Sequence, residues 1–123
     1  MFELKIITQF AAAHRLRNFQ GKCEQLHGHN WKVEVFVLAD QLDSAGLVRD
    51  FGEIKTTTQE ILNGLDHHYL NELTPFQEEN PSSEHIARYL FRQLSRLLND
   101  ERAKVSKVSV WESDTSCATY LEE

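Results

Sequence analysis

The sequence has little cysteine and little proline, and it lacks any long hydrophobic run. It contains two cysteines and two prolines in 123 residues. Two cysteines in a chain of this length do not provide the disulfide framework of a small secreted domain, so a reducing compartment is expected. No apolar run approaches the roughly 18 residues of a membrane helix, and residues 1–5 lack the basic start and apolar middle of a signal peptide. These absences predict a cytoplasmic protein without a membrane partner.

The sequence also has fewer basic than acidic residues. Nineteen acidic residues stand against thirteen basic ones, which gives a formal net charge of −6. A protein that binds nucleic acid normally carries a basic face, and no such run is present. Hydrophobic residues make up 41% of the chain and charged residues 26%, which is an ordinary globular balance. We therefore expect one domain, residues 1–123, that acts on a small molecule.

The hydrophobic pattern predicts two strands, two helices and two further strands. Alternation of apolar and polar residues indicates strands, and apolar residues three or four apart indicate one face of a helix. Asp50 is a typical N-cap for the first helix, and Pro81 is typical of the first turn of the second. The predicted strands span residues 2–12, 30–39, 104–112 and 117–121, with the helices between the second and third. We expect Phe51 and Leu97 to lie on buried helix faces, and Cys117 to be a small core residue.

This order is typical of an α+β fold, in which helices cover one face of an antiparallel sheet. A four-stranded sheet has two open edges, which a soluble protein must protect or pair with another copy. Oligomerisation is expected on that ground alone.

Three histidines form the sharpest local pattern. His27 and His29 are two residues apart at the start of a predicted strand, so their imidazoles point to the same face. His14 ends the preceding predicted strand, and a hairpin-like return would bring it opposite them. Three imidazoles suit zinc, whose catalytic sites keep three protein ligands and an open fourth position. The alternative is that these are ordinary surface imidazoles, because a His-x-His spacing is short and degenerate.

Cys23 precedes His27 by four residues, and three roles are open for it. It can be a fourth, structural metal ligand, which would close the site. It can be a buried apolar thiol, although the charged neighbours Lys22 and Glu24 argue against burial. It can also be a catalytic thiolate whose pKa is lowered by a nearby cation or metal.

Asp66 and His67 lie in an irregular segment after the first predicted helix. An aspartate beside a histidine can form an oriented acid–base pair, and loops often carry function. The alternative is a helix-end cluster in which histidines complement the carbonyl dipole. We interpret His68 and His85 as structural or surface residues. Glu112 ends a predicted strand, and composition alone gives it no special role.

Six segments in the right order resemble those of a known family. They are Ala12-Ala13-His14-Arg15-Leu16, Cys23 with His27-Gly28-His29-Asn30, Val48-Arg49-Asp50-Phe51, Leu65-Asp66-His67-His68-Tyr69-Leu70-Asn71, Asn80-Pro81-Ser82-Ser83-Glu84, and Glu112 with Tyr120. Together they resemble the 6-pyruvoyl-tetrahydropterin synthase family, over nearly the whole chain. The similarity is greater to its bacterial branch, which makes 6-carboxy-5,6,7,8-tetrahydropterin for queuosine biosynthesis.

The resemblance implies the tunnelling fold, in which four-stranded sheets from several subunits join into a barrel with helices outside. The implied assembly is a homohexamer of two trimers, with active sites between subunits. The implied metal is Zn²⁺ and its ligands are His14, His27 and His29. The resemblance also implies that Cys23 is the proton acceptor, that Asp66 and His67 form a relay, and that Glu112 anchors the pterin ring.

The implied substrate is 7,8-dihydroneopterin triphosphate. The expected products are 6-carboxy-tetrahydropterin, acetaldehyde and triphosphate, and the alternative within the family is 6-pyruvoyl-tetrahydropterin, formed without carbon–carbon cleavage. A triphosphate needs a local basic surface in a protein of negative net charge. Candidates for that surface are Arg15, Arg17, Lys22 and Lys55.

Two alternative functions lie outside this family. A cupin-type metal oxygenase is suggested by the spacing of Gly21, His27, His29 and Glu34, but the Pro-x-Gly of a second cupin motif is missing. Two helices also fit poorly in an all-β barrel. A non-enzymatic zinc-binding module explains the three histidines and leaves Cys23, His67 and Glu112 without a role.

Overall fold

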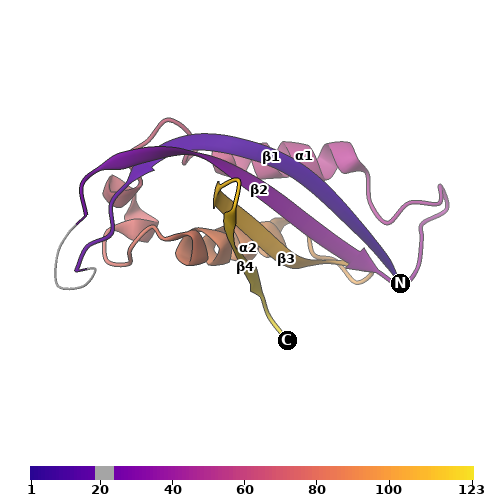
Figure 1. Cartoon of the computed structure of the whole chain (residues 1–123). Helices are drawn as coiled ribbons and strands as arrows, with labels where there is room; N and C mark the ends of the chain where they lie inside the picture. Colours follow the sequence, from indigo (N-terminus) through magenta and orange to yellow (C-terminus); the bar gives the residue numbers. More distant parts are fainter. Residues whose placement is uncertain (19–23) are drawn as a thin grey trace.

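The computed structural model describes residues 1–18 and 24–123, and Cys23 lies outside these residues. Its strands and helices follow the predicted order of two strands, two helices and two strands (Figure 1). The elements are β1 (Phe2–His14), β2 (His27–Ala39), α1 (Phe51–Leu62), α2 (Ser83–Leu98), β3 (Ala103–Ser113) and β4 (Ser116–Leu121). Two short 3₁₀ turns, Leu70–Glu72 and Thr74–Phe76, lie between the helices. The predicted α+β architecture is confirmed.

The four strands form one antiparallel sheet in the order β1-β2-β3-β4. The β1–β2 pair is in register from Phe2 opposite Ala39 to His14 opposite His27. Both strands extend beyond the sequence prediction, β1 to His14 and β2 back to His27. The extension adds the pairs His14–His27 and Ala13–Gly28 at the end of the hairpin, and hydrophobic alternation alone does not reveal such pairing.

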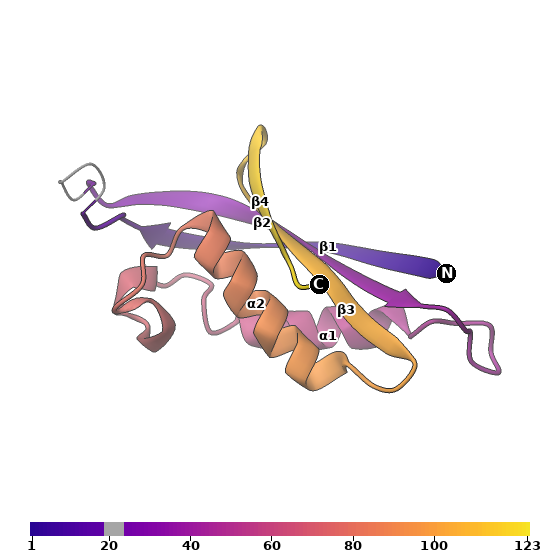
Figure 2. The ribbon, with the colours of Figure 1, turned by 90° about the horizontal axis from the view of Figure 1, so that it is seen from below.

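Both helices pack on the same face of this sheet, as Figure 2 shows. Helix α2 contacts β3 and β4, and helix α1 contacts β1 and α2. Asp50 caps α1 by accepting a hydrogen bond from the Gly52 amide, and Ser82 caps α2 through the His85 amide. Between sheet and helices lies one apolar core, in which the Phe10 and Trp31 rings stack 5.9 Å apart. Neither helix in the described part of the chain is long and apolar enough to cross a bilayer.

Three burial predictions were wrong. Phe51 is 49% exposed because it is the first residue of α1, one turn before the buried Ile54. Leu97 is 48% exposed, since the buried stripe of α2 continues from Leu94 to Leu98 and leaves Leu97 beside it. Cys117 is exposed, because it pairs with Trp111 on the sheet face that no helix covers.

The outer edge of β1 is partly covered near its end. A short parallel bridge joins Ala13 to Tyr69, and the Ala13 amide donates to the His68 carbonyl. Within the described residues no further strand pairs with the outer edges of β1 and β4. The sheet therefore keeps the two open edges that the sequence predicted.

Candidate metal centre

Four side chains meet at the end of the β1–β2 hairpin, on the face that the helices cover. They are His14, His27, His29 and Glu112, and their ligand atoms all lie within 4.8 Å of one another. Strand geometry explains the three histidines, because His14 is directly opposite His27 and His29 follows two residues later on the same face. The predicted grouping of the three histidines is present, and Glu112 joins it.

Glu112 points toward the histidines because it continues the core-facing series of β3, two residues after the buried Val110, and a β-bulge lies at the same position. Trp111 pairs with Cys117 and Ser113 pairs with Ser116, so Glu112 is the extra residue that faces no partner on β4. Such bulges kink a strand and re-aim a side chain, and they are frequent next to active sites. Alternation with Val108 and Val110 places Glu112 on the core face, although composition alone assigned it no role.

Hydrogen bonds to backbone carbonyls orient two of the imidazoles. His14 Nδ1 lies 2.8 Å from the Pro81 carbonyl oxygen, and His27 Nδ1 lies 2.9 Å from the Gln25 carbonyl oxygen. A carbonyl accepts only, so each Nδ1 carries a proton, and in the neutral imidazole Nε2 then keeps the lone pair. The two Nε2 atoms are 3.1 Å apart. This outer-shell arrangement is typical of histidine metal ligands.

Burial supports the same protonation state for His14. Its side chain is almost fully enclosed, and burial lowers the pKa of His14 below the ordinary value of 6.5. The hydrogen bond to Pro81 acts in the opposite direction but does not cancel this effect. His14 is consequently neutral at neutral pH, which is the form that binds a metal.

Distances within the cluster match a metal site. His29 Nε2 is 3.0 Å from Glu112 Oε1, and this buried nitrogen has no hydrogen-bond partner. Two donors that each lie about 2.0–2.1 Å from a tetrahedral zinc ion are about 3.3 Å apart. The His29–Glu112 and His14–His27 atom pairs, at 3.0 Å and 3.1 Å, are close to that separation. A buried nitrogen without a partner is costly, and a metal would satisfy it. Imidazole and carboxylate ligands fit Zn²⁺ among the common divalent ions.

Trp31 packs against two imidazoles of the cluster. Its ring lies edge-on to those of His14 and His29, with centroid separations of 4.9 Å and 5.2 Å. The indole Nε1 donates to the Ala12 carbonyl at 3.2 Å, and the side chain is fully buried. Because burial and the hydrogen bond to Ala12 hold the Trp31 ring in place, the ring limits the rotamers that the imidazoles of His14 and His29 can adopt.

Asp66 and His67, for which the sequence predicts an acid–base pair, are in contact at the edge of β1. Asp66 Oδ2 lies 3.0 Å from His67 Nδ1, while Asp66 Oδ1 accepts the Ala11 amide at 2.8 Å. The Ala11 hydrogen bond and the contacts with His67 lower the pKa of Asp66. His67 has a left-handed backbone, with φ of 61°, and its amide donates to the Ala11 carbonyl at 2.6 Å. A non-glycine residue in this region is strained and is often found at functional sites.

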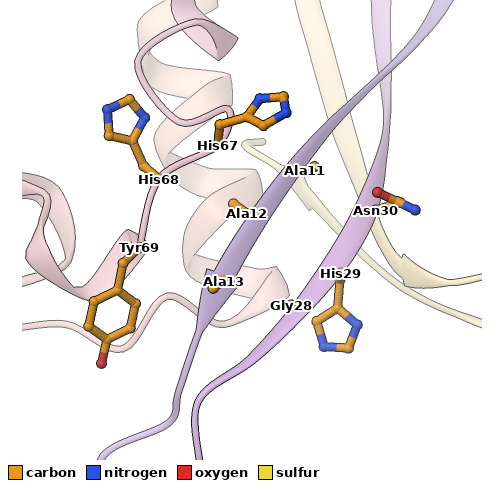
Figure 3. A pocket seen from close by; sticks show the side chains of 9 residues that line it. All are labelled: Ala11, Ala12, Ala13, Gly28, His29, Asn30, His67, His68 and Tyr69. Atoms are coloured by element: carbon orange, nitrogen blue, oxygen red, sulfur yellow. The ribbon is translucent and has the colours of Figure 1, made fainter.

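His67 does not join the four metal-site residues of its own chain. Its side chain is 81% exposed. Figure 3 shows His67 and His68 on a loop at one side of β1, with His29 and Asn30 on the neighbouring strand beyond it. A surface groove of about 500 Å³ extends across Ala11–Ala13 between the two groups. The structure therefore forms the Asp66–His67 pair without bringing it to the histidine cluster.

Two asparagines fix the chain that leaves β1. The Asn71 side chain exchanges two hydrogen bonds with the backbone of Arg15, and the Asn80 side chain does the same with Arg17. The Arg17 guanidinium also donates to the carbonyls of Phe76, Gln77 and Glu79. Arg17 was a candidate for triphosphate binding, and its guanidinium already donates three hydrogen bonds to these carbonyls. Sequence reasoning missed these contacts because they join residues roughly 60 positions apart.

The fold and the cluster define an α+β protein with a candidate metal centre at the end of its sheet. The cupin-type alternative was wrong, because two helices and a four-stranded open sheet replace the all-β barrel. The chain belongs to the 6-pyruvoyl tetrahydropterin synthase family, whose family model matches residues 3–123.

Relatives of known name agree with this assignment. The chain is 39% identical to the 6-carboxy-5,6,7,8-tetrahydropterin synthase of Synechocystis, over 91% of this chain and 87% of the relative. It is 30% identical to the protein of the same name from Haemophilus influenzae, over 99% of this chain and all of the relative.

Solved structures show that the fold is shared. The 6-pyruvoyl tetrahydropterin synthase of Caenorhabditis elegans superimposes with a TM-score of 0.86 at 22% identity, covering 99% of this chain and 96% of that one. The Plasmodium falciparum 6-pyruvoyl tetrahydropterin synthase gives a TM-score of 0.79 at 24% identity, covering 98% and 97%. The chain has the tunnelling fold that the sequence resemblance implied.

Proposed function

We propose that this chain is a zinc-dependent 6-carboxy-5,6,7,8-tetrahydropterin synthase of queuosine biosynthesis, located in the cytoplasm. It converts 7,8-dihydroneopterin triphosphate and water to 6-carboxy-tetrahydropterin, acetaldehyde and triphosphate. The observation that carries this proposal is the cluster of His14, His27, His29 and Glu112. That cluster lies in a chain 39% and 30% identical to two proteins of this name.

The reaction requires proton transfers around the substrate's three-carbon side chain. Two electrons move from the side chain to the dihydropterin ring, so protons must leave carbon and oxygen on one part of the molecule and be delivered to another. The three histidines would hold a zinc ion, which would supply Lewis acidity toward the side-chain oxygens. Cys23, as a thiolate, takes a proton from the side chain, and His67, oriented by Asp66, exchanges the second. The single domain, residues 1–123, provides all of these groups.

Glu112 anchors the pterin in this proposal. The aminopyrimidinone edge of a pterin offers two parallel N–H donors, and a carboxylate accepts both in a bidentate arrangement. Glu112 lies beside the metal-site histidines, with Oε1 3.0 Å from His29 Nε2, so a ring held there lies next to the metal centre. Anchoring of this kind holds the reacting bonds in register with the acid–base groups.

A homohexamer explains the position of His67. The Asp66–His67 pair is preformed but exposed, and it is not part of its own chain's cluster. The outer edges of β1 and β4 are available for pairing with other copies. We propose that the sheets of three copies join edge to edge, that two such trimers stack, and that His67 serves the site of a neighbouring subunit.

A second product is possible within the family. Elimination of triphosphate and internal redox alone give 6-pyruvoyl-tetrahydropterin, and the family model carries that name. Hydrolytic cleavage of the adjacent dicarbonyl then gives the 6-carboxy product and acetaldehyde. The two relatives named above favour the second outcome.

Metal-dependent turnover of 7,8-dihydroneopterin triphosphate tests the proposal. Protein stripped by a chelator should consume no substrate, and addition of one equivalent of Zn²⁺ per chain should restore consumption. The metal-stripped His27→Ala variant, treated in the same way, should recover little activity, because two imidazoles hold zinc weakly. Full turnover after complete metal removal would contradict the proposal. Zinc binding without any turnover would favour the non-enzymatic zinc-binding module.

A further inference from the structure

Two backbone carbonyls orient imidazoles of the metal centre, and both belong to residues that directly follow a fixed point of the backbone. His14 Nδ1 lies 2.8 Å from the Pro81 carbonyl oxygen, and His27 Nδ1 lies 2.9 Å from the Gln25 carbonyl oxygen. We propose that Asn80 is a positioning residue of the metal centre, because it holds the backbone on which both carbonyls depend. This inference rests on the proposed function, since it concerns zinc binding at that site.

Asn80 binds both polar groups of the Arg17 backbone. Its Oδ1 atom accepts the Arg17 amide at 2.8 Å, and its Nδ2 atom donates to the Arg17 carbonyl at 2.9 Å. Oδ1 also accepts from Arg17 Nε at 3.3 Å. The same guanidinium donates to the carbonyls of Phe76, Gln77 and Glu79, in the segment that leads to Asn80. This Asn80–Arg17 clamp joins the chain that leaves β1 to the chain that enters α2.

The Pro81 carbonyl lies between two fixed residues. On one side, the Asn80 side chain is bound to Arg17, and the Asn80 carbonyl accepts from His85 Nδ1 at 2.6 Å. On the other side, Ser82 caps α2 by accepting the His85 amide. Pro81 itself is buried, and its ring restricts φ to about −65°. Loss of the Asn80 side-chain contacts would therefore free this carbonyl to turn away from the imidazole that it orients.

The Gln25 carbonyl depends on the same clamp from the other direction. The Glu24 amide donates to the Leu16 carbonyl at 2.9 Å, and Leu16 directly precedes Arg17. This bond places Gln25, the next residue, beside the chain that Asn80 holds. One asparagine side chain therefore supports the outer hydrogen bonds of two imidazoles whose Nε2 atoms are 3.1 Å apart. Outer-shell partners of this kind fix the tautomer and the ring direction of histidine ligands.

Zinc affinity, measured by competition with a chelating dye, tests this inference without any need for turnover. Asn80→Ala should bind zinc about tenfold more weakly than the wild type, at the lower end of the range for outer-shell changes, because the carbonyls themselves remain. Asn80→Asp keeps the acceptor for the Arg17 amide and loses the donor to the Arg17 carbonyl, so its zinc affinity should fall by about threefold. NMR of the zinc-loaded proteins adds a structural signature, because the Nδ1 proton of His14 should exchange with water faster in Asn80→Ala.

Asn99→Ala is the matched control. Asn99 also binds a backbone group, since its Oδ1 atom accepts the Val105 amide at 2.7 Å, but it lies at the other end of the 16-residue helix α2, about 24 Å away. Its zinc affinity should stay within about twofold of the wild type, because distant sites act independently. Circular dichroism establishes that each variant is folded.

Zinc affinity within about twofold of the wild type in a folded Asn80→Ala or Asn80→Asp protein would overturn the inference. An equal loss of zinc affinity in Asn99→Ala would also overturn it, because the effect would then come from general stability. A wild type that binds no zinc would contradict the metal centre itself and this inference with it. Zinc binding without turnover would contradict only the proposed reaction and would leave this test intact.

Discussion

His14 Nδ1 lies 2.8 Å from the carbonyl oxygen of Pro81, a residue 67 positions further along the chain. This contact ties the end of β1 to the start of α2 and sets the tautomer of a metal-site imidazole. Asn80, next to Pro81, is bound in turn to the backbone of Arg17. The orientation of His14 therefore depends on the segment between the helices as well as on β1.

Replacement of His14 should abolish tight metal binding. His14→Ala removes one of three imidazoles and leaves His29 without support on that side, so the variant should purify with far less than one zinc per chain. Elemental analysis of the purified protein measures this. His68→Ala is the matched control, because His68 is exposed and lies outside the cluster, and it should keep its zinc. Full zinc occupancy in His14→Ala would contradict the assigned ligands.

Replacement of Cys23 should separate chemistry from metal binding. If the thiol is the proton acceptor, Cys23→Ala should keep zinc and fold but lose turnover by about 10²- to 10⁴-fold, the usual contribution of a positioned acid–base group. Zinc content and the rate of substrate consumption measure the two effects. A Cys23→Ala protein that bound zinc poorly would identify the thiol as a structural ligand instead.

Mixing of two inactive variants should restore activity if subunits share sites. His67→Ala lacks the relay residue, and Cys23→Ala lacks the proton acceptor. In randomly mixed oligomers, about one quarter of the sites would combine an intact Cys23 with an intact His67 from a neighbouring copy. Activity should therefore recover after the two proteins are dissociated and reassembled together. No recovery in oligomers that mass spectrometry shows to be mixed would argue against sites between subunits.

Glu34 should contribute stability that disappears in acid. Burial acts to raise the pKa of Glu34, but hydrogen bonds from Trp111 Nε1 at 2.5 Å and Lys5 Nζ at 3.2 Å outweigh it and lower the pKa below 4.5. The folded state favours the ionised form, so its stabilisation is present above pH 4.5 and is lost as the pH falls through the lower folded pKa.

Glu34→Gln should accordingly lower the free energy of unfolding by about 1–3 kcal/mol at neutral pH, because a hydrogen-bonded charge is lost. The difference from the wild type should shrink on acidification below pH 4.5. Urea unfolding at fixed protein concentration and several pH values measures this. A difference that stayed constant down to the acid limit would show that Glu34 acts through packing alone.

Much of this molecule could be predicted from local pattern. Strands, helices and caps follow from alternation, helical spacing and residues such as Asp50, because these signals act over a few positions. The grouping of His14, His27 and His29 also followed, since a hairpin return brings the end of one strand opposite the start of the next. Glu112 was not placed in the cluster, because the pairing that sets β3 beside β2 joins residues far apart in the chain and is not visible in the sequence.

Other features were equally hidden in the sequence. The left-handed backbone of His67 depends on hydrogen bonds to Ala11, in a strand far away in the chain. The use of Arg17 to bind carbonyls instead of phosphate depends on the fold of the segment before α2. Long-range contacts of this kind leave no periodic signal in one sequence.

The identity of the product tests the central claim most directly. Zinc-loaded protein is incubated with 7,8-dihydroneopterin triphosphate, and the pterins and volatile aldehydes are identified by mass spectrometry. The account predicts 6-carboxy-tetrahydropterin and acetaldehyde in equal amounts, both absent when Glu112→Ala protein replaces the wild type. Accumulation of 6-pyruvoyl-tetrahydropterin without acetaldehyde, or an unchanged substrate, would contradict it.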